Sequence, residues 1–206
     1  MKVVRAVSVA AVLGAGFGAT TSLINDLSSP YGELGGRLVR ARWTWVTEVA
    51  EVGSLLLDVG WAWAAVAVAA GWLARAIVRA AAAGAVSLMT AAAAYYLMDS
   101  LLRQEPVAGY IGETRYWWLA SLTLGPLLGA VGASLVRSGV IGLLARLIVP
   151  VGALVQTIVL QPGLASSSRP AAVWALVIVS AASVASISLV AARFAAQRSR
   201  GPARAG

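Results

Sequence analysis

The chain has 206 residues, of which 60% are hydrophobic and 12% are charged, whereas soluble domains average about 45–50% and about 25%. A soluble fold of this length could not bury so much apolar surface, so the composition predicts an integral membrane protein. The sequence contains no cysteine and no histidine, which excludes disulfide bonds, thiolate or imidazole catalysis, and zinc or iron–sulfur sites built on those ligands. We assign the net charge of +8 to cytoplasmic loops and tails rather than to a nucleic-acid surface.

Six apolar stretches are long enough to cross a bilayer core, which requires about 20 apolar residues per helix. In chain order they run over 3–24, 53–74, 80–101, 116–136, 140–160 and 171–192. We therefore expect an all-α, polytopic transmembrane helical bundle that forms a single domain over residues 1–192. An interfacial segment is expected between the first two spans, either as a helix over the mouth of the bundle or as an outward extension of the second span. Residues 193–206 are expected to be a basic, disordered cytoplasmic tail.

The first stretch also has the features of a signal peptide. Lys2 and Arg5 precede its apolar run, and Gly18-Ala19-Thr20 offers a cleavage site. Because five later spans already commit the chain to the membrane, we expect the first stretch to be a span, and whether it is retained or cleaved in the cell stays open.

Positive charge is distributed unevenly between the two ends of the expected spans. Ten of the 16 Lys and Arg residues fall on the side of the termini, and six fall on the other side. The ten are Lys2, Arg5, Arg75, Arg79, Arg137, Arg146, Arg193, Arg198, Arg200 and Arg204. The positive-inside rule then predicts a plasma-membrane protein with both termini in the cytoplasm.

Acidic and aromatic residues gather on the opposite, outer side. All eight acidic residues and 12 of the 15 aromatic residues fall there. The acidic residues are Asp26, Glu33, Glu48, Glu51, Asp58, Asp99, Glu105 and Glu113. An aromatic belt would place rings at both interfaces, so the one-sided distribution favours a cavity that opens outward, with the belt as the alternative.

Asp58 is the first candidate for an acid catalyst. It lies in an otherwise apolar run, residues 55–61, with no Lys or Arg one helical turn away. A carboxyl group within a membrane is costly and is a functional candidate by default. If residues 45–61 form one continuous helix, Glu51 shares a face with Asp58 and is a further candidate.

Asp99 and Glu113 are candidates that also have structural explanations. Asp99 lies one helical turn after Tyr95 and Tyr96, but Arg103 one turn later would hold it in an ion pair. Glu113 lies in the first turn of its helix, where the helix dipole favours an acid. The rings expected to line the cavity are Trp61, Trp63, Tyr95, Tyr96, Tyr116, Trp117 and Trp118.

Two further patterns concern packing. Glycines four residues apart, at Gly14 and Gly18 and at Gly125 and Gly129, let helices approach closely. Gln156 is an amide in the middle of an apolar span, so we expect it to form a hydrogen bond with a neighbouring helix.

Four strings carry a family resemblance: Gly60-Trp61-Ala62-Trp63, Ala94-Tyr95-Tyr96, residues 110–118 and residues 125–129. Over roughly residues 10–165 the chain resembles a family of small multi-spanning bacterial membrane proteins of unknown function, which implies membrane location and architecture. It also resembles the small membrane-bound type II terpene cyclases of bacterial indole-terpenoid pathways. That second resemblance implies cofactor-free protonation of an olefin or epoxide and assigns no catalytic position.

The function we predict is a metal-independent terpene cyclase without a cofactor. Burial in an apolar cavity raises the pKa of a carboxyl group and keeps it protonated near neutral pH, and aromatic faces stabilise a carbocation. No paired-aspartate motif for magnesium occurs, which excludes the usual metal-dependent ionisation. The expected partners are membrane lipid and a lipophilic small-molecule substrate, with no nucleic acid and an open oligomeric state.

Two alternatives remain. Intramembrane acids and aromatic cages also bind cations, so the protein is alternatively a small transporter or channel for a cation or an amphipathic amine. It is otherwise a non-enzymatic membrane scaffold. A closed aromatic cavity with one carboxyl group favours the enzyme, a continuous polar path favours transport, and the absence of a cavity favours the scaffold.

Overall fold

The computed structural model describes residues 2–161, 163 and 167–199, and among these residues the regular structure is entirely helical. The elements in chain order are α1 (Lys2–Ser28), α2 (Glu33–Arg40), α3 (Thr44–Leu57), α4 (Gly60–Ala74), α5 (Ile77–Arg103), the 3₁₀ turn η1 (Val107–Tyr110), α6 (Ile111–Ser134), α7 (Gly139–Val155), the π-helical turn η2 (Gln156–Leu160) and α9 (Pro170–Ser199).

Several of these helices are long and apolar enough to span a membrane. Within the described residues, α1, α5, α6, α7 with η2, and α9 each meet that requirement. The expectation of an all-helical protein with several such helices is therefore confirmed. The stretch expected as the second span is not one helix, because α3 and α4 meet at a 65° bend.

The segment between the first two expected spans contains the short helix α2 and the helix α3, which precedes α4. Asp26 holds α2 in place, since its carboxylate oxygens accept hydrogen bonds from the backbone N–H groups of Glu33 (2.9 Å) and Leu34 (2.8 Å). The first helix continues through Asn25 and Asp26 to Ser28, four residues beyond the expected end of the span at residue 24.

The core is formed where α1, α4, α5 and α6 pack through small residues. A side chain at Gly14 or Gly18 of α1 would collide with the α5 backbone at Ser87 or Ala91. Gly129 of α6 lies against Ala80 of α5, and Gly132 against Val68 of α4. These contacts confirm the predicted glycine faces, and they hold α4, α5 and α6 together at one end of the bundle.

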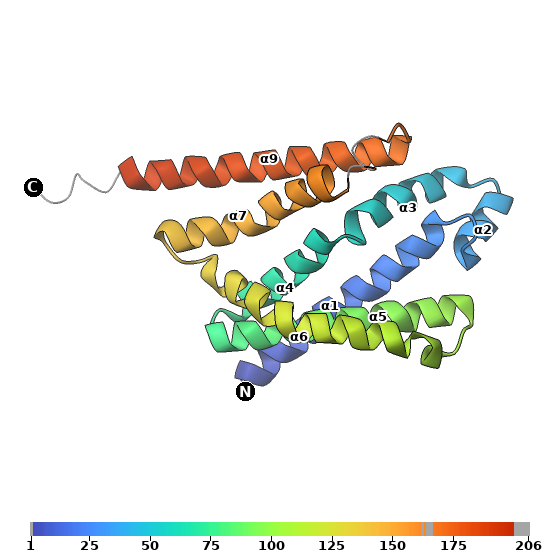
Figure 1. Ribbon diagram of the computed structural model, residues 1–206, viewed down its shortest axis with the longest axis horizontal. Coiled ribbons are helices and arrows are strands. Elements are labelled where there is room, and N and C mark those ends of the chain that lie inside the picture. The colour runs from blue at the N-terminus through green and yellow to red at the C-terminus, as the bar shows by residue number, and fades with distance from the viewer. Residues whose placement is uncertain (1, 162, 164–166, 200–206) are drawn as a thin grey trace, which may run out of the picture.

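α7 and α9 form a helical pair at the edge of this core. Figure 1 shows the two helices side by side, away from the N-terminus, with α3 beside α9. An ion pair between Arg169 and Glu51 (2.8 Å) joins the start of α9 to α3. α9 runs to Ser199, so residues 193–199 of the expected disordered tail are helical, and the remaining tail residues lie outside the described part of the chain.

Replacing Gly129 with alanine should destabilise the protein, because the new methyl group would collide with the backbone of Ala80. Overpacking of this kind costs roughly 1–3 kcal/mol, and thermal unfolding in detergent micelles measures it. Gly152→Ala in α7 is the matched control, since nothing lies within 4 Å of its added methyl group. Alanine is favoured over glycine in a helix, so the control should unfold at the same temperature or higher, and equal melting of both variants would contradict the proposed contact.

Candidate functional site

An apolar cavity of about 440 Å³ lies between α4, α5 and α6, beyond the close glycine contacts. Its volume is within the range of roughly 300–1,000 Å³ typical of small-molecule sites. Aliphatic residues of the three helices form part of its surface. Its aromatic and polar lining consists of Asp58, Trp63, Tyr95, Tyr96, Trp117 and Ser121.

The rings of this cavity form a connected cluster with Trp63 at its centre. The Trp63 ring lies 6.5 Å from that of Trp117 in a stacked arrangement and 6.1 Å from that of Tyr95. Phe17 of α1 packs edge-on against Trp63 at 5.4 Å. Tyr96 continues the cluster at 5.2 Å from Tyr95. The cavity is therefore lined by aromatic rings from three different helices.

Asp58 lies where α3 ends and α4 has not begun. Its backbone N–H still bonds to the carbonyl of Ser54, Val59 is extended, and α4 starts at Gly60. Residues 45–61 therefore do not form one continuous helix, the condition under which Glu51 would share a face with Asp58 is not met, and Asp58 belongs to the break. The side chain is exposed in the protein taken alone, so protein atoms do not enclose this carboxyl group.

An amide from η2 contacts the α4 side of this break. The side-chain oxygen of Gln156, the first residue of η2, accepts a hydrogen bond from the backbone N–H of Trp61 (2.9 Å). This bond satisfies one of the free N–H groups in the first turn of α4. A methyl group at Gly60 would lie 3.2 Å from the same oxygen, so glycine gives the amide room. The prediction that Gln156 bonds a neighbouring helix is confirmed.

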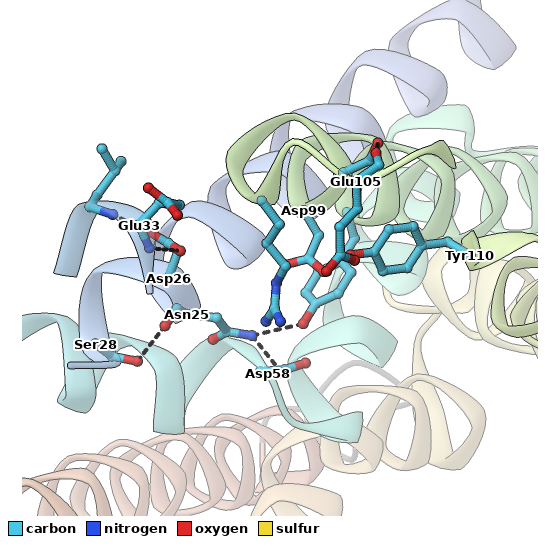
Figure 2. A network of polar contacts seen from close by, with 12 residues as sticks. Asn25, Asp26, Ser28, Glu33, Asp58, Asp99, Glu105 and Tyr110 are labelled. Carbon is cyan, nitrogen blue, oxygen red and sulfur yellow. Dashed lines mark hydrogen bonds and ion pairs between the residues drawn. The ribbon is translucent and has the colours of Figure 1, made fainter. Parts of the chain in front are cut away.

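Asn25 connects Asp58 to its surroundings, and the sequence analysis did not identify it as a site residue. Its amide nitrogen donates to Asp58 Oδ2 (2.7 Å) and to the Tyr95 hydroxyl oxygen (3.0 Å). Figure 2 shows the Asn25 amide directed toward Asp58. The Ser54 hydroxyl donates to the amide oxygen of Asn25 (2.7 Å). The Asn25 amide of α1 thus joins α3, α5 and the carboxyl group of Asp58.

A second cavity, of about 350 Å³, lies on the other side of this cluster and is lined mainly by polar residues. Asp99 and Arg103 form the predicted ion pair there (3.1 Å), and Glu105 accepts a hydrogen bond from the Tyr110 hydroxyl (2.7 Å). Figure 2 shows Asp99, Glu105 and Tyr110 grouped on this side. We call this space the outer cavity. Asp99 therefore lines the outer cavity and not the apolar one.

The remaining candidates lie outside the apolar cavity. Glu51 is paired with Arg169, and Glu113 is exposed in the first turn of α6. The Trp118 ring nitrogen donates to the carbonyl of Met89 (3.0 Å). Trp61 and Tyr116 do not line the cavity either. Of the predicted set, the structure brings together Asp58, Trp63, Tyr95, Tyr96 and Trp117.

The chemistry open to this arrangement follows from its single carboxyl group. A protonated Asp58 could donate its proton to an apolar molecule in the cavity, and an ionised Asp58 could bind a cation there. In both cases the rings would stabilise positive charge next to the carboxyl group. The chain has no match among protein families, curated proteins or solved structures, so its function has to be inferred from the geometry of this cavity.

Proposed function

We propose that the protein is a membrane-embedded, metal-independent terpene cyclase that starts its reaction by protonating an olefin or epoxide. The observation that carries the proposal is that Asp58 and the rings of Trp63, Tyr95, Tyr96 and Trp117 line one apolar cavity. A scaffold would need no such cavity.

The proposed reaction needs only a proton donor and a shielded cation. The carboxyl O–H of Asp58 would protonate a terminal olefin carbon or an epoxide oxygen, which leaves a carbocation on the substrate. A second double bond of the substrate then attacks the cation and closes a ring. Loss of a proton from a neighbouring carbon, back to the Asp58 carboxylate, gives a cyclised isomer and regenerates the acid. No atom is gained or lost, so no co-substrate is required.

The position of Asp58 suits this chemistry only if a ligand or lipid completes its enclosure. The cavity residues Trp117 and Leu124 are about half exposed in the protein alone (49% and 54%), which indicates a lateral opening. In a bilayer this opening would face acyl chains, so a lipophilic substrate would enter from the membrane. The substrate itself would then exclude water from Asp58, as a proton donor of this kind requires.

We also propose six spans with both termini in the cytoplasm, where α3 and α4 together count as one broken span. The support is the ten-to-six division of positive charge and the set of long apolar helices.

Reporter fusions after Arg79 and after Gly109 test this topology. The first position should report the cytoplasmic side and the second the outer side, because Arg79 lies in the first turn of α5 and Gly109 lies beyond the end of that helix. Two fusions that both report the cytoplasm would refute the arrangement.

A second candidate function is the binding or transport of a cation or amphipathic amine. The observation that favours it is the 65° break between α3 and α4 at Asp58, since transporters often bind substrate at discontinuous helices. An ionised carboxyl group next to aromatic rings is also a good environment for an ammonium group.

The deciding experiment incubates the purified protein in lipid nanodiscs with a panel of polyprenyl olefins, polyprenyl epoxides and prenylated indoles, without added metal. Mass spectrometry and NMR then detect cyclised isomers of unchanged mass. Formation of such an isomer supports the cyclase. If no isomer forms, and a long-chain quaternary ammonium salt quenches the tryptophan fluorescence in the wild type but not in Asp58→Asn, the cation-binding function replaces it.

A further inference from the structure

The Asn25 side chain uses all of its hydrogen-bonding groups within the protein. A primary amide has two N–H donors and one carbonyl oxygen. The nitrogen donates to Asp58 Oδ2 and to the Tyr95 hydroxyl oxygen, and the oxygen accepts from Ser54. Because residues outside α1 bind both the nitrogen and the oxygen of the amide, the Asn25 side chain is held in one orientation. In that orientation it fixes the positions of the side chains to which it is bonded.

The side chains of Asn25, Asp58 and Tyr95 mark the boundary between the two cavities. Asn25 lines the outer cavity, Asp58 lines the apolar cavity, and Tyr95 lines both. Hydrogen bonds of 2.7 Å and 3.0 Å from Asn25 join them directly. The outer cavity is lined by charged groups and the other by rings and aliphatic carbon, so this boundary separates a polar space from an apolar one.

We propose that Asn25 is the positioning residue of the site and the barrier between the two cavities. The amide nitrogen donates to Asp58 Oδ2, and a carbonyl oxygen is a better acceptor than a carboxyl O–H oxygen, so this bond favours the protonated form that carries its proton on Oδ1. Asn25 thereby leaves Oδ1 as the oxygen that acts on a ligand. Its bonds to Asp58 and Tyr95 span the boundary, and through them Asn25 limits the passage of water from the outer cavity to the rings. The use of Oδ1 as an acid rests on the proposed function, whereas the barrier does not.

The barrier can be tested by thiol labelling, because the chain contains no cysteine. Ser121→Cys places one thiol in the apolar cavity at a position that is 5% exposed. A charged methanethiosulfonate reagent is added to this variant in lipid nanodiscs, where the lateral opening faces lipid. We expect slow labelling with Asn25 present and labelling faster by roughly tenfold or more with Asn25→Leu, because the hydrogen bonds that close the boundary are lost.

Two further variants separate the amide from the fold of α1. Ser28→Ala removes a hydrogen bond to the backbone oxygen of Asn25 (2.8 Å) and leaves the amide intact, so its labelling should stay slow. Tyr95→Phe removes the acceptor on the other side of the boundary and should raise the rate even if Asn25→Leu does not fold. Equal labelling rates in the presence and absence of Asn25, or fast labelling in Ser28→Ala, would overturn the barrier.

The positioning role has a spectroscopic test that requires no substrate. The infrared spectrum of the protein minus that of Asp58→Asn isolates the bands of the Asp58 carboxyl group. Asn25→Leu should shift the carbonyl band because Oδ2 loses its donor, and Ser28→Ala should not. An unshifted band overturns the positioning role. If both tests succeed and no cyclised product is ever found, the proposed function fails while the role of Asn25 stands.

Discussion

Asp58→Asn should lose turnover by about 10²–10⁴-fold, the usual contribution of a positioned proton donor. Asparagine keeps the size of the side chain and an oxygen that can still accept the hydrogen bond from Asn25, so the network is preserved and only the acid is removed. The measurement is the rate of isomer formation in nanodiscs, together with the melting temperature as a check on folding.

Glu105→Gln and Glu33→Gln are the matched controls for this variant. Both carboxylates line the outer cavity, and neither lines the apolar one, so their turnover should equal that of the wild type. Asp99→Asn identifies the alternative acid. Full activity in Asp58→Asn combined with inactivity in Asp99→Asn would move the proton donor into the outer cavity, and full activity in both would remove acid catalysis from the proposal.

The helices and the composition of the cavity could be predicted from the sequence because both depend on local patterns. Apolar runs of bilayer length specify helices wherever they occur. The one-sided distribution of acids and rings indicated a shared cavity, and Asp58, Trp63, Tyr95, Tyr96 and Trp117 do line one.

Which ring of each pair faces the cavity could not be predicted in the same way. Trp61 and Trp63 are two residues apart, which places them about 200° apart around a helix, so no more than one of them can point inward. The choice depends on the direction in which α4 leaves the break at Asp58. No proline marks that break, and the amide that satisfies the new helix start comes from Gln156, 95 residues away.

Asn25 was missed for a similar reason. The sequence that follows it, Asp26-Leu27-Ser28-Ser29-Pro30, is typical of a turn, and its partners Ser54, Asp58 and Tyr95 lie 29, 33 and 70 residues further along the chain. A polar residue in the last turn of an apolar helix carries no local sign of such partners. The residue that organises the site is therefore visible only after α1, α3 and α5 are assembled.

Trp63→Leu should lower kcat by roughly thirtyfold and leave KM nearly unchanged. A desolvated cation–π contact is worth about 2 kcal/mol or more, and this contact exists only after the substrate has become a cation, so its loss appears in turnover rather than in ground-state binding. Trp63 is the ring to change because it contacts the rings of Phe17, Tyr95 and Trp117 at the centre of the cluster. Trp63→Phe, which retains a π face, should recover most of the loss.

Trp45→Leu provides the comparison for this loss, since Trp45 is 66% exposed and lies outside the cavity, and its turnover should match that of the wild type. If Trp63→Leu raises KM and leaves kcat unchanged, the ring serves only to bind the substrate. Equal losses in Trp63→Leu and Trp63→Phe would show that the shape of the indole matters rather than its π face. Only a loss confined to kcat, and recovered by phenylalanine, fits a cavity whose rings stabilise a cation that forms beside Asp58.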